Sequence, residues 1–314
     1  MTAHKIKLKS VLIVLLALAV LAGVWSVLRS CAALPCTAAS KLSAPAYSES
    51  DKVLNAVALS YLVYGCETCD GLSGTVSELL DTCAMGILNE NFGLKRADET
   101  DPASAAFDTS EFIRSHVGEF RFLADLKDDS SGFYGAAFCD DAGKCVWIAY
   151  AGAVTFCDAL ACGEFVLTPG LSRQEKMAVR LYETVLGSDE VQNQSYAVML
   201  TGHSLGGALA TMVACAGGLD AVTVNGADGI AVDKFRGMTG NQDHITRVSN
   251  YVTSPANGTV SFMDLVQRMM FLGEDTAVER HVYQQNGYTE DSHCAFSFVV
   301  LNDGAFEIPL SADR

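Results

Sequence analysis

A five-residue segment, Gly-His-Ser-Leu-Gly at positions 202–206, constrains the fold of this chain more than any other feature. An apolar run of strand length precedes it at 196–201, and a run rich in Ala, Leu and Gly that favours a helix follows at 205–216. At so sharp a strand-to-helix turn the Ser204 hydroxyl projects away from the backbone, and a Cβ at either glycine would clash. The amides of the helix N-terminus can then bind a developing negative charge. No lysine follows the glycines, which disfavours a phosphate-binding loop, so we predict a nucleophile elbow with Ser204 as the nucleophile.

Length and charge favour one enzyme-sized domain. The chain has 314 residues, half of them hydrophobic, which suits a domain of about 250 residues with an N-terminal extension. We divide it into an N-terminal segment, 1–30, a linker, 31–50, and a globular domain, 51–314. The formal charge of −16 disfavours nucleic acid as a partner, because phosphate binding needs basic patches. Solubility is the simplest role for this acidity.

The N-terminal segment predicts a membrane anchor. Three lysines between positions 5 and 9 precede an uncharged, largely apolar run at 10–28. That run is longer than the roughly 7–15 apolar residues of a secretory signal and close to the roughly 20 of a spanning helix. Lysines on its N-terminal side predict a cytoplasmic N-terminus, so we expect a transmembrane helix with the globular domain outside the cytoplasm. A cleaved signal peptide, with a small-x-small site at 30–32 and a secreted product, is the alternative.

The eleven cysteines include several that are close in sequence. These pairs are Cys66 with Cys69, Cys139 with Cys145, and Cys157 with Cys162. Cys139 and Cys145 flank a turn at 140–144, so we expect a hairpin to bring them together, and in an oxidising compartment such pairs can be disulfides. A zinc site at Cys66 and Cys69 is the alternative there, but it lacks a second Cys/His pair at usable spacing. We therefore predict neither a metal nor a cofactor. Cys215, inside the helix after the elbow, is expected to be a buried free thiol.

The order of expected elements indicates an α/β fold. Residues 51–64 have helical periodicity, and a capping box at 172–175 opens a second helix that Gly187 can end. Besides the strand before the elbow, the expected strands are 134–139, 145–150, 221–224 and 245–253. The stretch 66–130 gives no clear pattern. Apolar runs that alternate with helices predict a mostly parallel sheet with helices on both faces.

The segment around the elbow carries a family resemblance. Thr-Gly-His-Ser-Leu-Gly-Gly-Ala-Leu-Ala at 201–210 resembles the elbow of the fungal-type (class 3) lipases. Further segments resemble that family at 148–153, 222–227, 248–252 and 291–293. The similarity covers roughly residues 50–310 and is closest to a bacterial lipase-like branch of poorly defined activity. It implies the α/β-hydrolase fold and the hydrolysis of carboxylic esters of lipids.

A serine nucleophile needs a base that removes its proton, and in α/β-hydrolases the chain order is serine, acid, histidine. His244 precedes the strand that should carry the acid, so this order excludes it. His281 and His293 remain, and His293 matches the position of the family's catalytic histidine. We predict His293 as the general base. His203, within the elbow, is expected from the resemblance to pack beside it.

The remaining parts of the site depart from the family pattern. The oxyanion hole is predicted to use the backbone N–H of Leu205 and, from the resemblance, that of Ala153. Ala151 replaces the arginine usual in this turn. Where the resembling branch has an Asn-Asp-x-Val motif, the chain reads Asn-Gly-Thr-Val at 257–260, without a carboxylate. Asp264, the next carboxylate, is predicted to orient the base, and Asp228, after the preceding strand, is the alternative.

Two functions follow from these residues. The first is an extracytoplasmic lipase, esterase or phospholipase that cleaves lipid or small esters through Ser204, His293 and Asp264, with its anchor holding it near lipid. The second is a catalytically impaired lipase-fold protein that binds a lipid or a partner. The intact elbow and His293 favour the first function. The missing acid and the altered oxyanion turn favour the second.

Overall fold

The computed structural model describes residues 47–82, 108–152, 171–227, 248–254, 278–284, 299–302 and 305–308. The predicted anchor at 10–28 lies outside these ranges, as do Cys157 and Cys162. Among the described residues, no helix combines the length and apolar character needed to cross a membrane.

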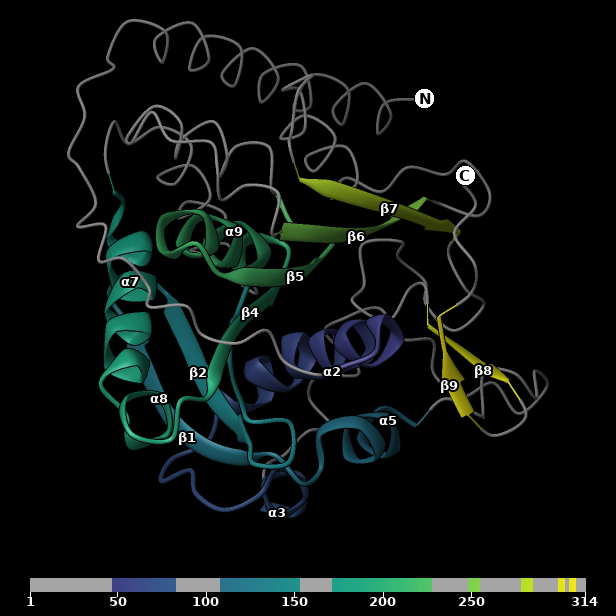
Figure 1. Cartoon of the computed structure of the whole chain (residues 1–314), viewed down its shortest axis with the longest axis horizontal. Helices are drawn as coiled ribbons and strands as arrows, with labels where there is room; N and C mark the ends of the chain where they lie inside the picture. Colours follow the sequence, from purple (N-terminus) through teal and green to yellow (C-terminus); the bar gives the residue numbers. More distant parts are fainter. Residues whose placement is uncertain are drawn as a thin grey trace, which may run out of the picture.

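The main sheet has seven strands in chain order (Figure 1). Its strands are β1 (Arg121–Asp128), β2 (Phe133–Asp140), β3 (Cys145–Tyr150), β4 (Ala197–His203), β5 (Asp220–Val224), β6 (Val248–Ser254) and β7 (Glu279–Gln284). The pairs β1–β2 and β2–β3 are antiparallel, and every pair from β3 to β7 is parallel. A separate hairpin joins β8 (Val300–Asn302) to β9 (Ala305–Glu307). The predicted mostly parallel sheet is confirmed.

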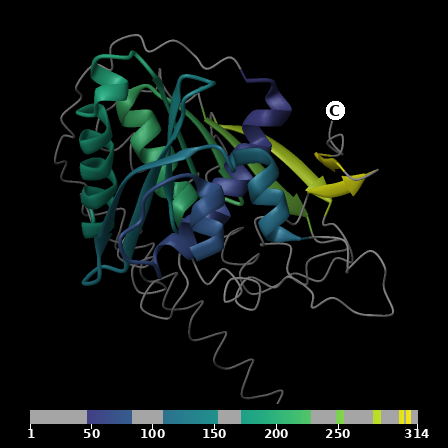
Figure 2. The ribbon, with the colours of Figure 1, turned by 90° about the horizontal axis from the view of Figure 1, so that it is seen from below.

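Helices cover both faces of this sheet, as predicted. The helices are α2 (Glu49–Cys66), α3 (Val76–Thr82), α5 (Thr109–Val117), α7 (Arg173–Leu186), α8 (Asp189–Gln192) and α9 (Leu205–Gly217). Alternate residues of β3 join opposite cores, because side chains alternate across a strand: Trp147 packs in the core that contains α2, α3 and α5, and Ile148 in the core that contains α7 and α9. Figure 2 shows the two groups of helices on opposite sides of the sheet.

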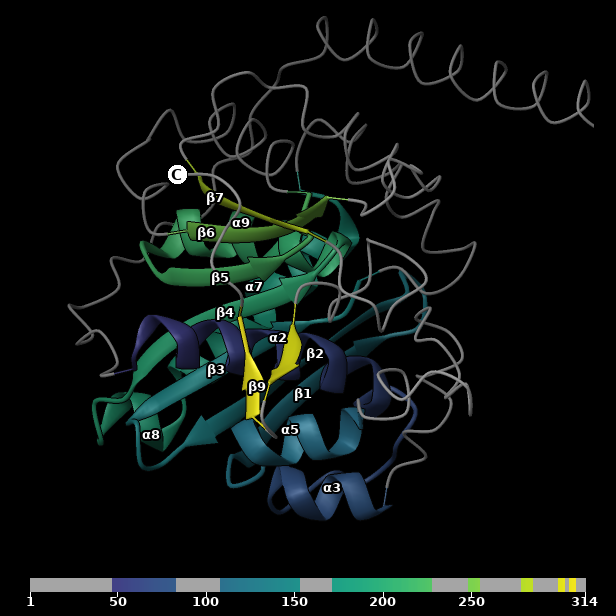
Figure 3. The ribbon, with the colours of Figure 1, turned by 90° about the vertical axis from the view of Figure 1, so that its right-hand side faces the viewer.

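Helix α2 is buried on every side rather than along one face. Its side chains are buried from Val53 to Cys66, and in Figure 3 it crosses in front of the sheet, where it contacts β2, β3, β4 and β5. The predicted helix at 51–64 is confirmed. The sequence predicted one apolar face, but the structure buries the side chains on every face of the helix. Two hydroxyls tie it to the strand before the elbow: Ser60 Oγ lies 2.9 Å from Thr201 Oγ1, which donates to the Ala56 carbonyl at 3.2 Å.

Local capping explains where α7 begins. The Ser172 side chain accepts a hydrogen bond from the Glu175 amide, and the Glu175 carboxylate accepts one from the Ser172 amide at 2.6 Å. Gly187 is the C-cap residue. The predicted capping box and helix end are both confirmed. The described parts of 66–130, which the sequence left unorganised, form α3, α5 and β1.

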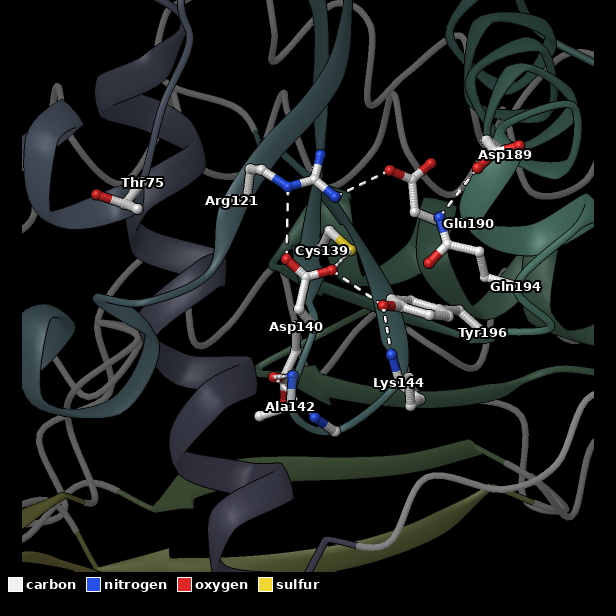
Figure 4. Close-up of polar contacts among 12 residues, drawn as sticks. Thr75, Arg121, Cys139, Asp140, Ala142, Lys144, Asp189, Glu190, Gln194 and Tyr196 are labelled. Atoms are coloured by element: carbon white, nitrogen blue, oxygen red, sulfur yellow. Dashed lines mark hydrogen bonds and ion pairs between the residues drawn. The ribbon is translucent and has the colours of Figure 1, made fainter.

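Polar side chains fasten the start of β4 to the β2–β3 turn, at the end of the sheet opposite the elbow (Figure 4). Tyr196, which precedes β4, donates its hydroxyl to Asp141 at 3.0 Å and accepts from Lys144 at 2.9 Å. Arg121 pairs with Asp141 at 3.5 Å and with Glu190 at 2.9 Å. The network therefore joins β1, the β2–β3 turn and the segment that enters the nucleophile strand.

The structure corrects the expected cysteine pairs. In the hairpin Cys139 lies opposite Val146, and Cys145 lies opposite Asp140. This offset of one position puts the two thiols on opposite faces of the sheet, where both are free and buried. Cys69 is disulfide-bonded whereas Cys66 is a free buried thiol, so these two are not joined to each other. Cys215 is buried and forms no disulfide, as predicted.

Candidate active site

Ser204 occupies the turn between β4 and α9, as the sequence predicts. Its backbone has φ 57° and ψ −121°, which lies in none of the regions open to ordinary residues and is typical of a strained site. The Ser204 amide donates to the Val224 carbonyl at 3.1 Å. Its carbonyl accepts from the amides of Ala208 at 3.2 Å and Ala227 at 3.3 Å. Strand β5, helix α9 and the turn after β5 thus hold the serine in a conformation that it would not adopt alone.

The two glycines of the pentapeptide are required by close backbone approaches. A Cβ on Gly202 would lie 2.8 Å from the Gly207 nitrogen and closer still to the carbonyl of Gly206. A Cβ on Gly206 would lie 2.8 Å from the carbonyl carbon of Tyr150, at the end of β3, and closer to its oxygen. Both neighbours are backbone atoms that cannot swing aside. The steric reason for glycine at these positions is therefore confirmed.

The turn after β5 is fixed by two asparagines that sequence reasoning did not identify. Asn225 has a positive φ of 46°, and its side-chain oxygen accepts from the Thr253 amide at 2.9 Å. Asn250, fully buried, accepts from the Gly226 amide at 3.2 Å and donates to the Gly226 carbonyl at 2.9 Å. An Asn-Gly pair after a strand is a turn signal, and an asparagine within an apolar strand requires a partner. These were the available clues.

His203 packs beside the elbow, as the resemblance implies. It is buried, and its Nδ1 lies 3.1 Å from the hydroxyl of Tyr64, near the end of α2. The same hydroxyl accepts a hydrogen bond from the Gly152 amide at 2.9 Å. The preceding amide, that of Ala151, donates to the Tyr134 carbonyl at 3.0 Å. The first two amides beyond β3 are therefore both engaged within the protein.

The amide of Leu205, one of the two predicted oxyanion donors, lies at the start of α9. Leu205 is the first residue of α9, so its N–H has no acceptor one turn earlier within the helix. It lies at the positive end of the helix dipole, next to the partly exposed Ser204. The other predicted members of the site, Ala153, His293 and Asp264, and the alternative acid Asp228 lie outside the described residues.

His281, the alternative base, lies within β7 and far from the nucleophile. In the register of the sheet it is level with His203, but three strands away, which corresponds to about 14 Å at the usual strand spacing. Its ring stacks on Tyr251 at 4.4 Å between centroids, and its Nε2 lies 3.5 Å from a Glu279 oxygen. This position does not bring His281 to Ser204.

No group of three or more His, Cys, Asp or Glu side chains gathers in a metal-binding arrangement within the described part of the chain. The chemistry that the described residues support is instead that of a serine on a strained turn beside a helix N-terminus. This arrangement suits attack on a carbonyl carbon and stabilisation of the resulting oxyanion.

A comparison with protein families agrees with the resemblance carried by the elbow residues. Residues 159–217, which include the elbow, match the family model described as Lipase (class 3). This match confirms the resemblance seen at 201–210 and the expected enzyme class, a carboxylic ester hydrolase. No curated protein matches the sequence.

Among solved structures, the chain is similar to a Rhizomucor miehei lipase propeptide complex, with 16% identity, 85% of each chain covered and a TM-score of 0.41. A lipase from Rhizopus microsporus var. chinensis has 15% identity over 84% of this chain and 87% of its own, with a TM-score of 0.42. A mono- and diacylglycerol lipase from Aspergillus oryzae has 16% identity over 65% of this chain and 69% of its own, with a TM-score of 0.35.

Proposed function

We propose that this protein is a serine hydrolase that cleaves carboxylic esters of lipids, with Ser204 as the nucleophile. The observation that carries the proposal is the strained backbone of Ser204, which sits between a buried strand and the first amide of α9. The match of residues 159–217 to class 3 lipases supports an ester as the substrate. We also propose that the ester substrate is a lipid, either a glyceride or a phospholipid.

In the proposed reaction the Ser204 oxygen attacks the ester carbonyl while His293 takes the hydroxyl proton. The Leu205 amide and a second amide stabilise the oxyanion of the tetrahedral intermediate. His293 then returns the proton to the leaving alcohol, and water releases the acyl group from Ser204 by the same steps. Because the Ala151 and Gly152 amides are engaged, the second donor is proposed to be the next amide, that of Ala153.

Asp264 is proposed to orient His293, with Asp228 as the alternative acid. The Ala227 amide donates to the Ser204 carbonyl, so the chain that leads to Asp228 leaves β5 beside the elbow. Loss of an orienting acid costs roughly 10⁴ in turnover in well-studied triads. Turnover of Asp264→Asn and Asp228→Asn therefore distinguishes the two, since only the true acid should give so large a loss.

The domain is proposed to lie outside the cytoplasm on the anchor at 10–28, or to be secreted after cleavage. The three lysines before that run support the orientation, and the disulfide-bonded Cys69 suits an oxidising compartment. Protease added to intact cells should degrade an anchored external domain. Protection until the membrane is opened would contradict this orientation.

The central test is Ser204→Ala in the full-length chain, purified in detergent. Hydrolysis of p-nitrophenyl esters, triacylglycerol emulsions and phospholipid vesicles should be abolished, together with labelling by a fluorophosphonate probe, while the circular dichroism spectrum is unchanged. Ser188→Ala is the matched control, because Ser188 caps α8 without a side-chain hydrogen bond to it. Hydrolysis that persists in Ser204→Ala would refute the proposal.

The second candidate function is a catalytically impaired module that binds lipid or a partner. The absence of a carboxylate at 257–260 and the alanine at position 151 favour it. For this function, the parent protein should bind phospholipid vesicles and resist the fluorophosphonate probe. Labelling of Ser204 would exclude it.

A further inference from the structure

The short segment that leaves β5 is bonded to both backbone polar groups of the nucleophile. The Ser204 amide donates to the Val224 carbonyl at 3.1 Å, and the Ser204 carbonyl accepts from the Ala227 amide at 3.3 Å. Between these two residues, Gly226 packs directly on α9, because a Cβ on Gly207 would lie only 2.7 Å from the Gly226 Cα. A displacement of this segment would therefore also displace the Ser204 backbone.

The side chain of Asn250 clasps Gly226 from the neighbouring strand, β6, which lies beside β5 (Figure 1). Asn250 is fully buried, and its side-chain oxygen accepts from the Gly226 amide at 3.2 Å while its nitrogen donates to the Gly226 carbonyl at 2.9 Å. A backbone amide can only donate and a carbonyl can only accept, so this pairing fixes the orientation of the side-chain amide. An aliphatic side chain of similar size would supply neither bond.

The clasp begins where the regular pairing of β5 with β6 ends. The register runs to Val224 opposite Tyr251, and the Asn225 amide then donates to the Tyr251 carbonyl at 2.8 Å. Asn225 has a positive φ of 46°, so the chain turns out of the strand at this residue. Gly226 therefore lies beyond the last paired residue of β5. The Asn250 side chain gives it the two hydrogen bonds that a neighbouring strand gives elsewhere in the sheet.

We propose that Asn250 is a positioning residue that holds the Ser204 backbone in its strained conformation by clasping Gly226. A residue in such a conformation persists only where its surroundings over-determine it, and the segment that Asn250 holds supplies partners for both the amide and the carbonyl of Ser204. The kinetic part of this proposal rests on the proposed hydrolase function. The structural part does not, because the clasp and the elbow exist whether or not the protein turns over an ester.

The first measurement is amide hydrogen exchange, followed by NMR at single residues in the full-length chain in detergent. In Asn250→Ala the amides of Gly226 and Ala227 should exchange about tenfold faster than in the parent, the effect of about one lost hydrogen bond. Each rate is compared with the amides of β4 in the same protein, because lower global stability would speed the exchange of all core amides. Unchanged relative exchange at Ala227 would overturn the link between the clasp and the elbow.

The second measurement is kinetic, with Val248→Ala as the matched control. Val248 is also buried in β6 and lies on the same face as Asn250, but it is opposite Ala221, near the end of β5 that is far from the elbow. A misplacement of about 1 Å near the reacting groups costs about 10²-fold in rate, so kcat should fall about that much in Asn250→Ala. KM should stay near that of the parent, because the buried side chain contacts protein rather than substrate. Val248→Ala should keep the parent's kcat at a temperature at which both variants are folded.

Asn250→Asp is a second variant that changes the side chain less and serves if Asn250→Ala does not fold. Its carboxyl group keeps an oxygen that can accept from the Gly226 amide, but in the ionised form it cannot donate to the Gly226 carbonyl. Its kcat should therefore lie between those of the parent and Asn250→Ala.

The outcomes separate this proposal from the proposed function. A parent-level kcat in both Asn250 variants would overturn the positioning role. An equal loss of kcat in Val248→Ala would also overturn it, because the effect would then be one of general stability. A parent protein that hydrolyses no ester refutes the proposed function, and hydrogen exchange at Ala227 then decides the structural part alone.

Discussion

Replacement of Gly206 by alanine tests how tightly the elbow packs against the sheet. The added methyl would meet the backbone of Tyr150 at 2.8 Å from its carbonyl carbon, and also the carbonyl carbon of Ala151 at 2.9 Å. Strand β3 cannot retreat easily, because β2 and β4 pair with it on both sides. We therefore expect a cost at the upper end of the range for overpacking, about 3 kcal/mol.

The same substitution has a smaller favourable effect. Gly206 lies in the first turn of α9, and alanine gains up to about 1 kcal/mol over glycine in a helix. The net loss in the free energy of unfolding is then about 2 kcal/mol, which lowers Tm by about 4–8 °C in a domain of 150–250 residues. Displacement of Ser204 should also slow its labelling by the fluorophosphonate probe.

Gly187→Ala is the matched control, because it adds the same methyl at the end of another helix. There the nearest atom would be an ordinary 3.4 Å away, and φ is −81°, which alanine adopts freely. This variant should gain about 0.4–1 kcal/mol. Thermal unfolding followed by circular dichroism compares the two. A Gly206→Ala protein that unfolds at or above the parent's temperature would refute the close approach of α9 to β3.

Two further predictions concern residues away from the nucleophile. Asn250→Ala should lower the free energy of unfolding by about 1–3 kcal/mol for each group of Gly226 left unpaired, and urea unfolding that matches the parent's would contradict this. The hydrogen bonds from Arg173, which has the larger effect, and from Ser131 hold the pKa of the Asp128 carboxyl below its usual range. The ionised Asp128 therefore stabilises the folded state fully above about pH 4, and this stabilisation is lost as the pH falls further. Urea midpoints of the parent and Asp128→Asn should therefore differ at pH 7 and converge in acid, and a gap that is independent of pH would exclude this linkage.

The parts of the fold that the sequence predicted are those encoded within a few residues. The pentapeptide at 202–206 carries its own steric requirement for glycine, and the capping box at 172–175 is closed by residues three apart. Strands β2 to β6 were predicted from apolar runs of the right length, whereas β1 and β7 were not. Each of these features depends on local backbone geometry, which a single sequence records directly.

The parts that the sequence did not predict depend on contacts between distant residues. Tyr64 is 88 residues from Gly152 and 139 from His203, and no local pattern links a tyrosine at the end of one helix to two strand ends. The prediction that a hairpin brings Cys139 and Cys145 together as a disulfide pair was wrong for a related reason. Closeness in a hairpin was predictable, but the register that decides which face each thiol occupies was not.

The backbone of Ser204 bears on the choice between a hydrolase and an impaired binding module. A non-glycine residue in such a conformation costs about 1–3 kcal/mol, and glycine would relieve much of that strain. The chain uses glycine two residues before and two residues after, where backbone contacts demand it, but keeps a serine at the strained position itself. A module that only binds gains nothing from a hydroxyl held there, whereas a nucleophile must project from this turn. The strain at Ser204 therefore favours ester hydrolysis over binding alone.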